Sequence, residues 1–419
     1  MKILLIHQNF PGQYKHLAPA LVAQGHEVIA LTCKVKEPQT WKGVKIIPYA
    51  IQGNSTKNIH PWLADFETKI IRATSCYRGA KALREQGFIP DVICAHHGWG
   101  ESMFLKDIWP EARLGLYCEL YHLTSKPFLD FDPEFPSKSP EADRLRIRMK
   151  NLNNRLHEEV MDAGISPTQF QASTFPAHWQ DRITVAHDGI DTELVRPNPA
   201  AQLKISDDLT LTRDDEVITF INRNLEPYRG YHIFMRALPE ILKRRKNAHV
   251  VLLGGDEVSY GAKPPAGQSW KQIFIDEVRG RIPTPHWNRV HFLGRVPYDR
   301  FLAMMQVSTA HVYLTYPFVL SWSLLEAMSA GCAILASGTE PVREVMTEDE
   351  NGWMVDFFDK EALVERLDAL LNDPATRARM GANARSFVQE NYDLQGVCLP
   401  QHIDWVNRLA ALDPRPVRD

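Results

Sequence analysis

The chain has 419 residues, of which 44% are hydrophobic and 24% charged, and its formal net charge is −3. This length predicts two domains, and the nearly balanced charge argues against a nucleic-acid-binding protein. The six cysteines form no C-x-x-C pair, which argues against a zinc knuckle or a dithiol redox site and favours a reducing cytoplasm.

The N-terminal stretch MKILLIHQNFPGQ predicts a buried first strand rather than a secretion signal, because its apolar run covers only Ile3 to Ile6. No uninterrupted apolar stretch approaches the roughly 18 to 20 residues that a membrane span requires. Any contact with a membrane is therefore expected to be peripheral.

Short β-branched runs alternate with longer amphipathic segments, and the series restarts after a proline-containing linker near residues 197–204. Such alternation indicates parallel sheets covered by helices. We expect an N-terminal domain at 1–197, a second α/β domain at 198–395, and a C-terminal helix within 396–419 that packs back on the first domain. Ligands of doubly wound sheets bind outside the carboxyl ends of the strands, so a cleft between the two domains is the expected site.

A strand followed by a serine-capped helix, YPFVLSWSLLEAMSAG, is the first candidate site. Ser321 or Ser323 can cap this helix, and the first turn, through Trp322 to Leu324, would present backbone N–H groups to a phosphate. Glu326 lies about one turn further on, where its carboxylate could accept both hydroxyls of a ribose. The alternative is an ordinary helix whose glutamate favours the N-terminal end of the helix dipole.

The segment SLLEAMSAGCAILAS resembles the donor-site signature of the large retaining GT-B glycosyltransferase family 4, also called glycosyl transferases group 1. Glu326 matches the second carboxylate of that signature, which in the family holds the nucleotide ribose. Phe318 stands where the family has its first carboxylate, which usually contacts hydroxyls of the transferred sugar. The resemblance therefore implies the ribose contact but not that sugar contact.

The segment FINRNLEPYRG resembles the family's strand followed by two cations, with Arg223 at the first position and Arg229 in place of the usual lysine. Two fixed cations would stabilise the charge that collects on a departing nucleoside diphosphate. The alternative is a surface turn with two solvated arginines. In FLGRV, which also resembles a family segment, the backbone around Arg295 and Val296 would receive the nucleobase.

Gly12, in the loop HQNFPGQ, could let backbone approach a phosphate or sugar, and similar family members place a glycine-containing loop there. A lone glycine is not the G-x-G-x-x-G of a dinucleotide-binding fold, which argues against an oxidoreductase. The family also has a histidine that follows the strand of DVICAHH and reaches the donor sugar. We favour His97, although the sequence does not separate it from His96.

Two glutamates near strand ends, Glu101 and Glu119, are candidate acceptor-side carboxylates, with structural hydrogen-bonded acids as the alternative. A metal at His96, His97 and Glu101 is not expected, because adjacent side chains of an extended segment point apart. The DFD motif at 130–132 lies in a proline-rich loop, for which a solvated loop without metal is the prediction.

The basic segment DRLRIRMKNLNNRL has apolar residues at helical spacing. The simpler prediction is that this stripe packs on the core while the arginines are solvated. The alternative is a helix that lies on an anionic membrane leaflet or meets a lipid-diphosphate acceptor. The stripe comprises Leu145, Met149, Leu152 and Leu156.

The resemblance covers nearly the whole chain and implies an α/β protein of the GT-B fold, with two doubly wound Rossmann-like parallel-sheet domains facing across a cleft. It implies a cytoplasmic retaining enzyme that transfers a hexose, with UDP-glucose as the favoured donor, to a growing polysaccharide or lipid-linked glycan. The resemblance is strongest to bacterial and cyanobacterial enzymes of envelope polysaccharide assembly. No cofactor, metal or nucleic-acid partner is expected. A peripheral contact with the inner face of the plasma membrane stays open as an alternative.

Other functions remain open at this point. A GT-B enzyme of another reaction, such as a nucleotide-sugar hydrolase, epimerase or phosphorylase, would share the nucleotide contacts. A non-catalytic glycan-binding protein would fit Phe318 but would not need two diphosphate cations.

Overall fold

The computed structural model describes residues 1–125 and 130–416, and the chain divides into two compact units. The first unit comprises Met1–Asp188 and Gln395–Asp419, and the second comprises Gly189–Leu394. The expected boundary at residue 197 therefore lies inside the second unit. The reason is packing, because Ile190 and Val195, which precede the expected linker, are buried in the core of that unit.

The first unit is built on an eight-stranded sheet with the order β3-β4-β2-β1-β5-β6-β7-β8. All neighbouring strands pair in parallel except β3, which is antiparallel to β4. The strands are β1 (Lys2–Ile6), β2 (Glu27–Thr32), β3 (Gln39–Trp41), β4 (Val44–Pro48), β5 (Val92–His96), β6 (Arg113–Tyr117), β7 (Ala163–Ser166) and β8 (Ile183–Val185).

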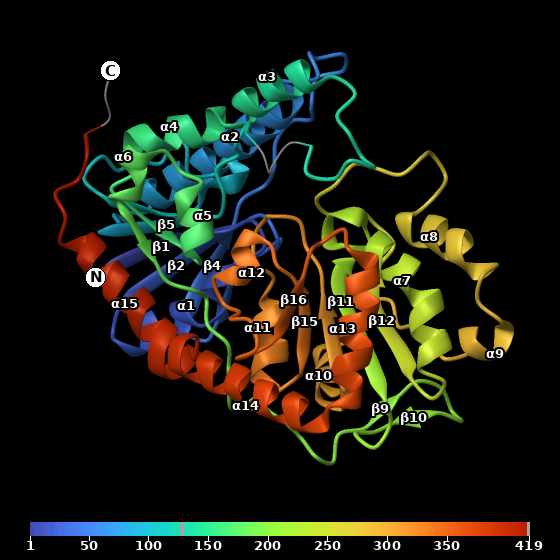
Figure 1. Cartoon of the computed structure of the whole chain (residues 1–419). Coiled ribbons are helices and arrows are strands. Elements are labelled where there is room, and N and C mark those ends of the chain that lie inside the picture. Colours follow the sequence, from blue (N-terminus) through green and yellow to red (C-terminus); the bar gives the residue numbers. More distant parts are fainter. Residues whose placement is uncertain (126–129, 417–419) are drawn as a thin grey trace. The chain divides into compact units, whose positions relative to one another are not determined.

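Helices cover both faces of this sheet (Figure 1). Successive side chains of a strand point to opposite faces. Leu4 and Ile6 therefore join one core, shared with α2 and α4, while Ile3 and Leu5 join the other, shared with α1 and α15. The helices of this unit are η1 (Gly12–Lys15), α1 (Leu17–Ala23), α2 (Ala64–Glu85), η2 (His97–Trp99), α3 (Pro140–Lys150), α4 (Leu152–Val160), α5 (Gln169–Ser173), α6 (Ala177–Gln180) and α15 (Leu399–Ala410), with η4 (Leu394–Cys398) leading into α15.

The C-terminal helix α15 belongs to the first unit and packs on β6. Gly115, in the middle of β6, makes this approach possible, because a Cβ atom there would lie only 2.6 Å from the Trp405 ring. Trp405 is buried, and its indole N–H donates to the carbonyl oxygen of Gly164 at 3.0 Å. Gly115 thus contributes no side chain to the core, but its small size allows α15 to pack closely on the sheet.

The second unit has a six-stranded, all-parallel sheet with the order β13-β12-β11-β14-β15-β16, and a separate antiparallel pair, β10-β9. The strands are β9 (Leu203–Lys204), β10 (Thr210–Leu211), β11 (Val217–Asn224), β12 (His249–Gly255), β13 (Val290–Phe292), β14 (Ala310–Tyr313), β15 (Ile334–Ser337) and β16 (Trp353–Val355). The helices are η3 (Pro227–Arg229), α7 (Tyr231–Arg244), α8 (Trp270–Arg279), α9 (Thr284–Trp287), α10 (Tyr298–Val307), α11 (Trp322–Ser329), α12 (Glu340–Arg343), α13 (Lys360–Asn372) and α14 (Pro374–Asn391).

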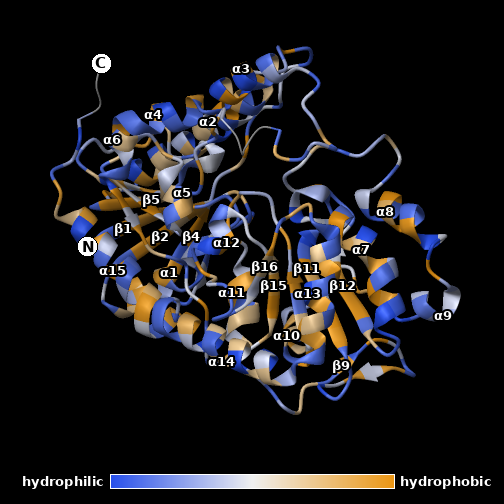
Figure 2. Cartoon of the chain, viewed as in Figure 1, coloured by the Kyte–Doolittle hydropathy of each residue, from blue (hydrophilic) through white to orange (hydrophobic). Residues whose placement is uncertain are grey.

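The strands of both sheets are among the most hydrophobic parts of the chain (Figure 2). This follows from burial on both faces, which requires nearly continuous apolar runs. Two parallel sheets in two units confirm the predicted α/β class. In each unit the carboxyl ends of parallel strands meet at one edge, which concentrates the loops after β5, β6, β11 and β14 there.

The apolar stripe of α3 and α4 does not pack as predicted. Leu145 and Leu156 are 40% and 37% exposed, and Met149 and Leu152 are only partly buried. The buried positions of these helices lie on another face and are largely polar. They are Ile147, Asn153, Asn154, His157 and Val160. Within the described ranges, no helix is both long enough and apolar enough to cross a bilayer.

A buried ion pair fastens the chain near residue 415 to the first unit. The Lys106 ammonium lies 2.9 Å from the Asp162 carboxylate, and both side chains are almost completely buried. The same carboxylate accepts backbone N–H groups of Leu114 and Arg415, each at 2.6 Å, while Lys106 donates to the carbonyl oxygen of Arg415. The two charges are thus paired and further hydrogen-bonded, as burial of charge requires.

Replacement of Lys106 by Met should destabilise the protein by about 3 to 5 kcal/mol, because it leaves the Asp162 carboxylate buried without its cation. Calorimetric unfolding would measure the loss. Lys45→Met is the matched control, since Lys45 pairs with Glu27 at 3.0 Å on the surface and should change stability by less than about 1 kcal/mol. Equal effects of the two substitutions would contradict the assignment.

Candidate functional site

The helix α11 begins at the carboxyl end of β14, as the sequence predicts. Ser321 is its N-cap, and the Ser321 hydroxyl accepts the backbone N–H of Ser323 at 3.3 Å. The N–H of Leu324 donates to the carbonyl oxygen of Ser321, also within this first turn. Two of the backbone N–H groups predicted to bind a phosphate therefore already have a local acceptor. Fewer N–H groups of this turn are free for a ligand than the sequence predicts. Trp322 is 46% exposed at the start of the helix.

Glu326 is held by a tyrosine that the sequence did not single out. The hydroxyl of Tyr298, at the start of α10, donates to Glu326 Oε1 at 2.7 Å. Burial and the neighbouring Glu326 charge raise the pKa of Tyr298, which keeps the phenol protonated as a donor. Tyr298 lies two residues after Val296, and its position beside an already suspected segment is the only sequence signal for it.

The two predicted cations have different environments. Arg223, near the end of β11, is exposed and forms no hydrogen bond or ion pair with any residue in the described parts of the chain. Arg229 is only 5% exposed. It donates to the Thr315 hydroxyl at 2.7 Å and to the carbonyl oxygen of Val319 at 3.1 Å. All partners of the Arg229 guanidinium among the described residues are thus uncharged.

Aromatic rings surround Arg229. The guanidinium carbon lies 5.1 Å from the centre of the Tyr260 ring and 5.6 Å from that of Phe318, within the range of cation–π contact. The rings of Tyr260 and Phe318 are 4.9 Å apart, and Tyr228 contacts both. Phe318, which replaces the family's first carboxylate, is therefore part of an aromatic group against a buried cation.

Arg295 uses its side chain within the second unit. It donates to the Asn224 amide oxygen at 3.2 Å and forms an ion pair with Glu257. Val296 packs against the hydrophobic core. Because the side chains of both residues have structural roles, their backbone is what remains for the nucleobase contact, as the resemblance implies.

In the first unit, Gly12 follows β1 and has a positive φ of 46°. A Cβ atom at this position would overlap the His7 imidazole, so the loop requires glycine here. His7 itself is held on both ring nitrogens, since Nδ1 accepts the Asn9 N–H at 3.0 Å and Nε2 lies 2.6 Å from Gln13 Oε1. Burial lowers the pKa of His7 to about 4, in keeping with a neutral ring.

His97 is held entirely within its own unit. It is 1% exposed, with Nδ1 2.8 Å from the carbonyl oxygen of Tyr117 and Nε2 2.9 Å from Asn154 Oδ1. In His96, Nδ1 accepts the Gly98 N–H, which places the ring proton on Nε2. That nitrogen has no hydrogen-bond partner among the described residues. The preference for His97 stays a prediction. The Nε2 without a hydrogen bond keeps His96 open as the ligand contact, although its ring is also buried, at 2% exposed.

The two candidate acceptor carboxylates also differ. Glu101 is 1% exposed and accepts a hydrogen bond from the Tyr49 hydroxyl at 3.1 Å, with the Arg72 guanidinium 3.5 Å away. Burial raises the pKa of Glu101, although Arg72 and Tyr49 favour its charged form. The Glu119 side chain is 47% exposed, and one of its oxygens lies 3.7 Å from His96 Nε2. Glu119 is therefore the more accessible of the two acids.

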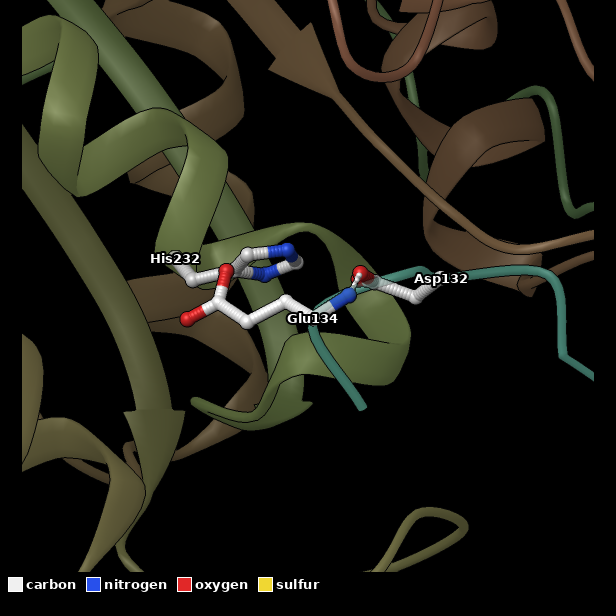
Figure 3. A group of neighbouring side chains, drawn as sticks. All are labelled: Asp132, Glu134 and His232. Atoms are coloured by element: carbon white, nitrogen blue, oxygen red, sulfur yellow. Dashed lines mark hydrogen bonds between the residues drawn. The ribbon is translucent and has the colours of Figure 1, made fainter. Parts of the chain in front are cut away.

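The loop with the DFD motif is not simply solvated. Asp130 is exposed, but Asp132 is 3% exposed and accepts the backbone N–H of Glu134 at 2.9 Å (Figure 3). His232, also drawn in Figure 3, belongs to the second unit, whereas the two acids belong to the first. The three side chains are therefore not a metal site of either unit.

Two parallel-sheet units, the first with a glycine loop after β1 and the second with an arginine pair and a capped helix, are the arrangement expected for the GT-B fold. The family model "Glyco_trans_4_3: Glycosyl transferase family 4 group" matches residues 24–195, and "Glycosyl transferases group 1" matches residues 202–387. Together these matches span most of the chain, which belongs to this glycosyltransferase family.

Relatives of known name agree with this family. The chain is 24% identical over 377 residues to a D-inositol 3-phosphate glycosyltransferase of Corynebacterium efficiens, with 87% of this chain and 82% of the relative covered. It is also 25% identical to a GDP-mannose-dependent mannosyltransferase of Mycolicibacterium smegmatis that acts on a phosphatidylinositol monomannoside, over 49% of this chain and 51% of that one.

Solved structures agree on the fold. Sucrose-phosphate synthase from Thermosynechococcus elongatus superposes with a TM-score of 0.74 at 17% identity, covering 98% of this chain and 100% of that one. Anabaena HepE in complex with UDP superposes with a TM-score of 0.65 at 18% identity and the same coverage. HepE has also been solved with UDP-glucose. The predicted GT-B class is confirmed.

Buried histidines should make the protein sensitive to acid. Burial lowers the pKa of His157 in the first unit to about 3 and that of His311 in the second unit to about 4. The unfolded chain binds protons near pH 6.5, so it binds more protons than the folded chain between pH 6.5 and 4, and stability falls as the pH falls through that window. Each such histidine should cost about 1 kcal/mol between pH 7 and 5.5.

Calorimetric unfolding at several pH values would test this, with Thr219→Val as a variant that removes the hydroxyl 2.9 Å from His311 Nδ1 without changing its burial. The variant should retain the acid sensitivity. An unfolding temperature that stays constant from pH 7 to 5 would contradict the prediction.

Proposed function

We propose that this enzyme transfers a hexose, glucose from UDP-glucose, to a growing polysaccharide or lipid-linked glycan, with retention at the anomeric carbon. The observation that carries the proposal is the Arg229 guanidinium, which is buried and has no carboxylate partner among the residues that the structure describes. The capped helix α11 begins a few residues after Thr315 and Val319, the residues that hold this guanidinium. A buried cation with uncharged partners is incompletely compensated, and a diphosphate would complete it. The choice of UDP-glucose is supported by the fold shared with HepE, which binds it.

The proposed mechanism is stabilisation of the leaving group. Arg223, Arg229 and the N-terminus of α11 would hold the diphosphate as the bond from the anomeric carbon to the phosphate oxygen breaks. Glu326, oriented by Tyr298, would hold the ribose. The acceptor oxygen forms the new bond to the anomeric carbon on the same face, and its proton passes to a phosphate oxygen of the leaving diphosphate.

The first unit would supply the remaining groups. His97, or His96 on the geometry above, would hold the donor sugar, and the loop at Gly12 would approach it through its backbone. Glu119 and Glu101 are the candidates for acceptor hydroxyls, with Glu119 favoured by its exposure. The proposal needs neither metal nor cofactor, since the cations named above supply the charge, and it places the enzyme in the cytoplasm.

A thermal-shift panel with UDP, GDP, ADP and dTDP, with and without a chelator, tests the donor class. A ligand present at 100 times its dissociation constant should add about 2.7 kcal/mol to the free energy of unfolding. We expect this from UDP alone, unchanged by the chelator. A shift with GDP only would refute the uridine donor, and loss of the shift on chelation would refute metal independence.

Arg223→Ala should weaken UDP binding at least about tenfold, since it removes one of two phosphate cations. At the same UDP concentration the added stability should then fall from about 2.7 to about 1.4 kcal/mol or less. The transfer rate, measured in a separate activity assay, should also fall at least about tenfold. Arg281→Ala is the matched control, because Arg281 is also an exposed arginine of the second unit without a side-chain partner in the described parts of the chain. Equal transfer rates for the two variants would exclude the role of Arg223.

We also propose that the exposed face of α3 and α4 makes a peripheral contact with a membrane. Such a contact would bring the enzyme to a lipid-linked acceptor. The apolar stripe is half-exposed, with Leu145 and Leu156 the most accessible. Arg144, Arg148 and Arg155 are exposed and form no ion pair with any described residue. Arginines beside an apolar stripe suit the surface of an anionic bilayer.

Vesicle sedimentation tests this contact. Wild-type protein should bind vesicles containing phosphatidylglycerol but not neutral phosphatidylcholine vesicles, with an affinity that falls as salt is added. Replacement of the three arginines by Glu should abolish binding. The matched control exchanges three exposed lysines of the same unit, Lys36, Lys57 and Lys81, for Glu. If the arginine variant and the lysine variant lose vesicle binding equally, the net charge of the protein and not this face is responsible for the binding.

A further inference from the structure

One carboxylate of the second unit is buried and forms no ion pair with any residue in the described parts of the chain. Glu226 is 0% exposed and lies between the end of β11 and η3. Its side chain accepts three successive backbone N–H groups, those of Ser259 at 3.1 Å, Tyr260 at 3.3 Å and Gly261 at 3.2 Å. Successive N–H groups of this kind form a natural anion site, which here is filled by the protein's own side chain.

The loop that Glu226 holds has few other reasons to be ordered. It follows β12, and its Tyr260 is 38% exposed, so it adds little to a core. Three hydrogen bonds to backbone N–H groups offset the cost of burying a carboxylate. The effect of these three hydrogen bonds is therefore to fix the position of the loop. Asn224 adds to it by donating to the Ser259 hydroxyl at 2.6 Å.

The position of this loop decides what lies against Arg229. Tyr260 is the loop residue whose ring lies over the Arg229 guanidinium and contacts the Phe318 ring at a tilted angle of 55°. Glu226 also reaches Arg229 through its backbone, because its carbonyl oxygen accepts the Arg229 N–H at 3.2 Å. One residue thus fixes both the backbone of Arg229 and the ring that covers its side chain.

We infer that Glu226 is a positioning residue, which holds the Ser259–Gly261 loop so that Tyr260 orients the guanidinium of Arg229 toward a diphosphate. This inference rests on the proposed function, since the diphosphate is its ligand. Orientation matters because a planar guanidinium binds phosphate oxygens through a fixed fork of donors, and a rotated plane loses one arm of the fork.

A double-mutant cycle separates this role from a purely structural one. Glu226→Gln removes the charge from the carboxylate, and Tyr260→Leu removes the ring from an exposed position. Each should weaken UDP binding about tenfold, measured by calorimetry, because each releases the same guanidinium. The double variant should also bind UDP only about tenfold more weakly than wild type, not about a hundredfold. The reason is that the effects of two coupled residues do not add. Tyr260→Phe, which keeps the ring, should bind UDP within about twofold of wild type.

Asp215→Asn is the matched control for stability. The Asp215 carboxylate accepts the Thr212 N–H at 2.8 Å near the other end of β11, so it fastens a turn away from Arg229. This control should lower the unfolding temperature without changing UDP affinity. If Glu226→Gln does the same, or if its effect adds fully to that of Tyr260→Leu, the inference is overturned.

Hydrogen exchange, measured on the nucleotide-free protein, tests the role of Glu226 independently of the proposed function. In Glu226→Gln the amides of Ser259, Tyr260, Gly261 and Arg229 should exchange faster than in wild type, whereas Asp215→Asn should leave them unchanged. Unchanged exchange in Glu226→Gln would overturn the inference even in an enzyme that binds UDP. Faster exchange in a protein that binds no nucleoside diphosphate would support the positioning of Arg229 while refuting the proposed donor.

Discussion

The buried guanidinium of Arg229 is the interaction on which the site of the second unit depends. Arginine does not lose its proton in a protein interior, so its charge must be compensated where it lies. The partners that the described residues provide are a hydroxyl, a carbonyl oxygen and aromatic rings, none of them anionic. These contacts fix the guanidinium without neutralising it. A site built this way retains its attraction for an anion, which a salt bridge would have reduced.

The surroundings of Arg229 explain why Phe318 is compatible with the site. A carboxylate at position 318 would bring a negative charge near the guanidinium, whose carbon lies 5.6 Å from the centre of the Phe318 ring. A phenyl ring instead packs against the cation and against Tyr260. The exchange of an acid for an aromatic ring thus leaves the arginine charge available, at the cost of a polar contact to a sugar hydroxyl.

Much of the fold could be predicted from the sequence, because its signals are local. Alternating apolar strands and amphipathic helices predicted two parallel sheets. Ser321 and Ser323 predicted a capped start of α11, and the structure shows that Ser321 is the cap. Arg223 and Arg229 could be singled out because the segment FINRNLEPYRG resembles the family's strand with two cations, and they lie at and just after the carboxyl end of β11. In each case neighbouring residues in the chain carry the information, through periodicity or capping.

Other features of the site could not be predicted, because they join segments far apart in the sequence. Tyr298 reaches Glu326 from another helix, and Glu226 holds a loop more than thirty residues away, at Ser259. The same reason explains the histidines. Only the fold reveals that His97 is held by Asn154, while His96 Nε2 forms no hydrogen bond with any described residue. The failure at α3 and α4 is different. There the apolar stripe was correctly seen, but a polar face with its own hydrogen bonds packs inward instead.

That inward polar face connects the helices to the chemistry of the first unit. Asn153 donates to the carbonyl oxygen of His97 at 2.9 Å, and Asn154 faces the His97 ring. His157, one turn further along α4, lies 2.8 Å from the Ser102 hydroxyl. Buried polar groups must be paired, so these contacts fix the face that α4 turns toward the sheet. The requirement to hold His97 therefore determines which face of α4 is buried, and it leaves the apolar face of the same helix available for a partner outside the unit.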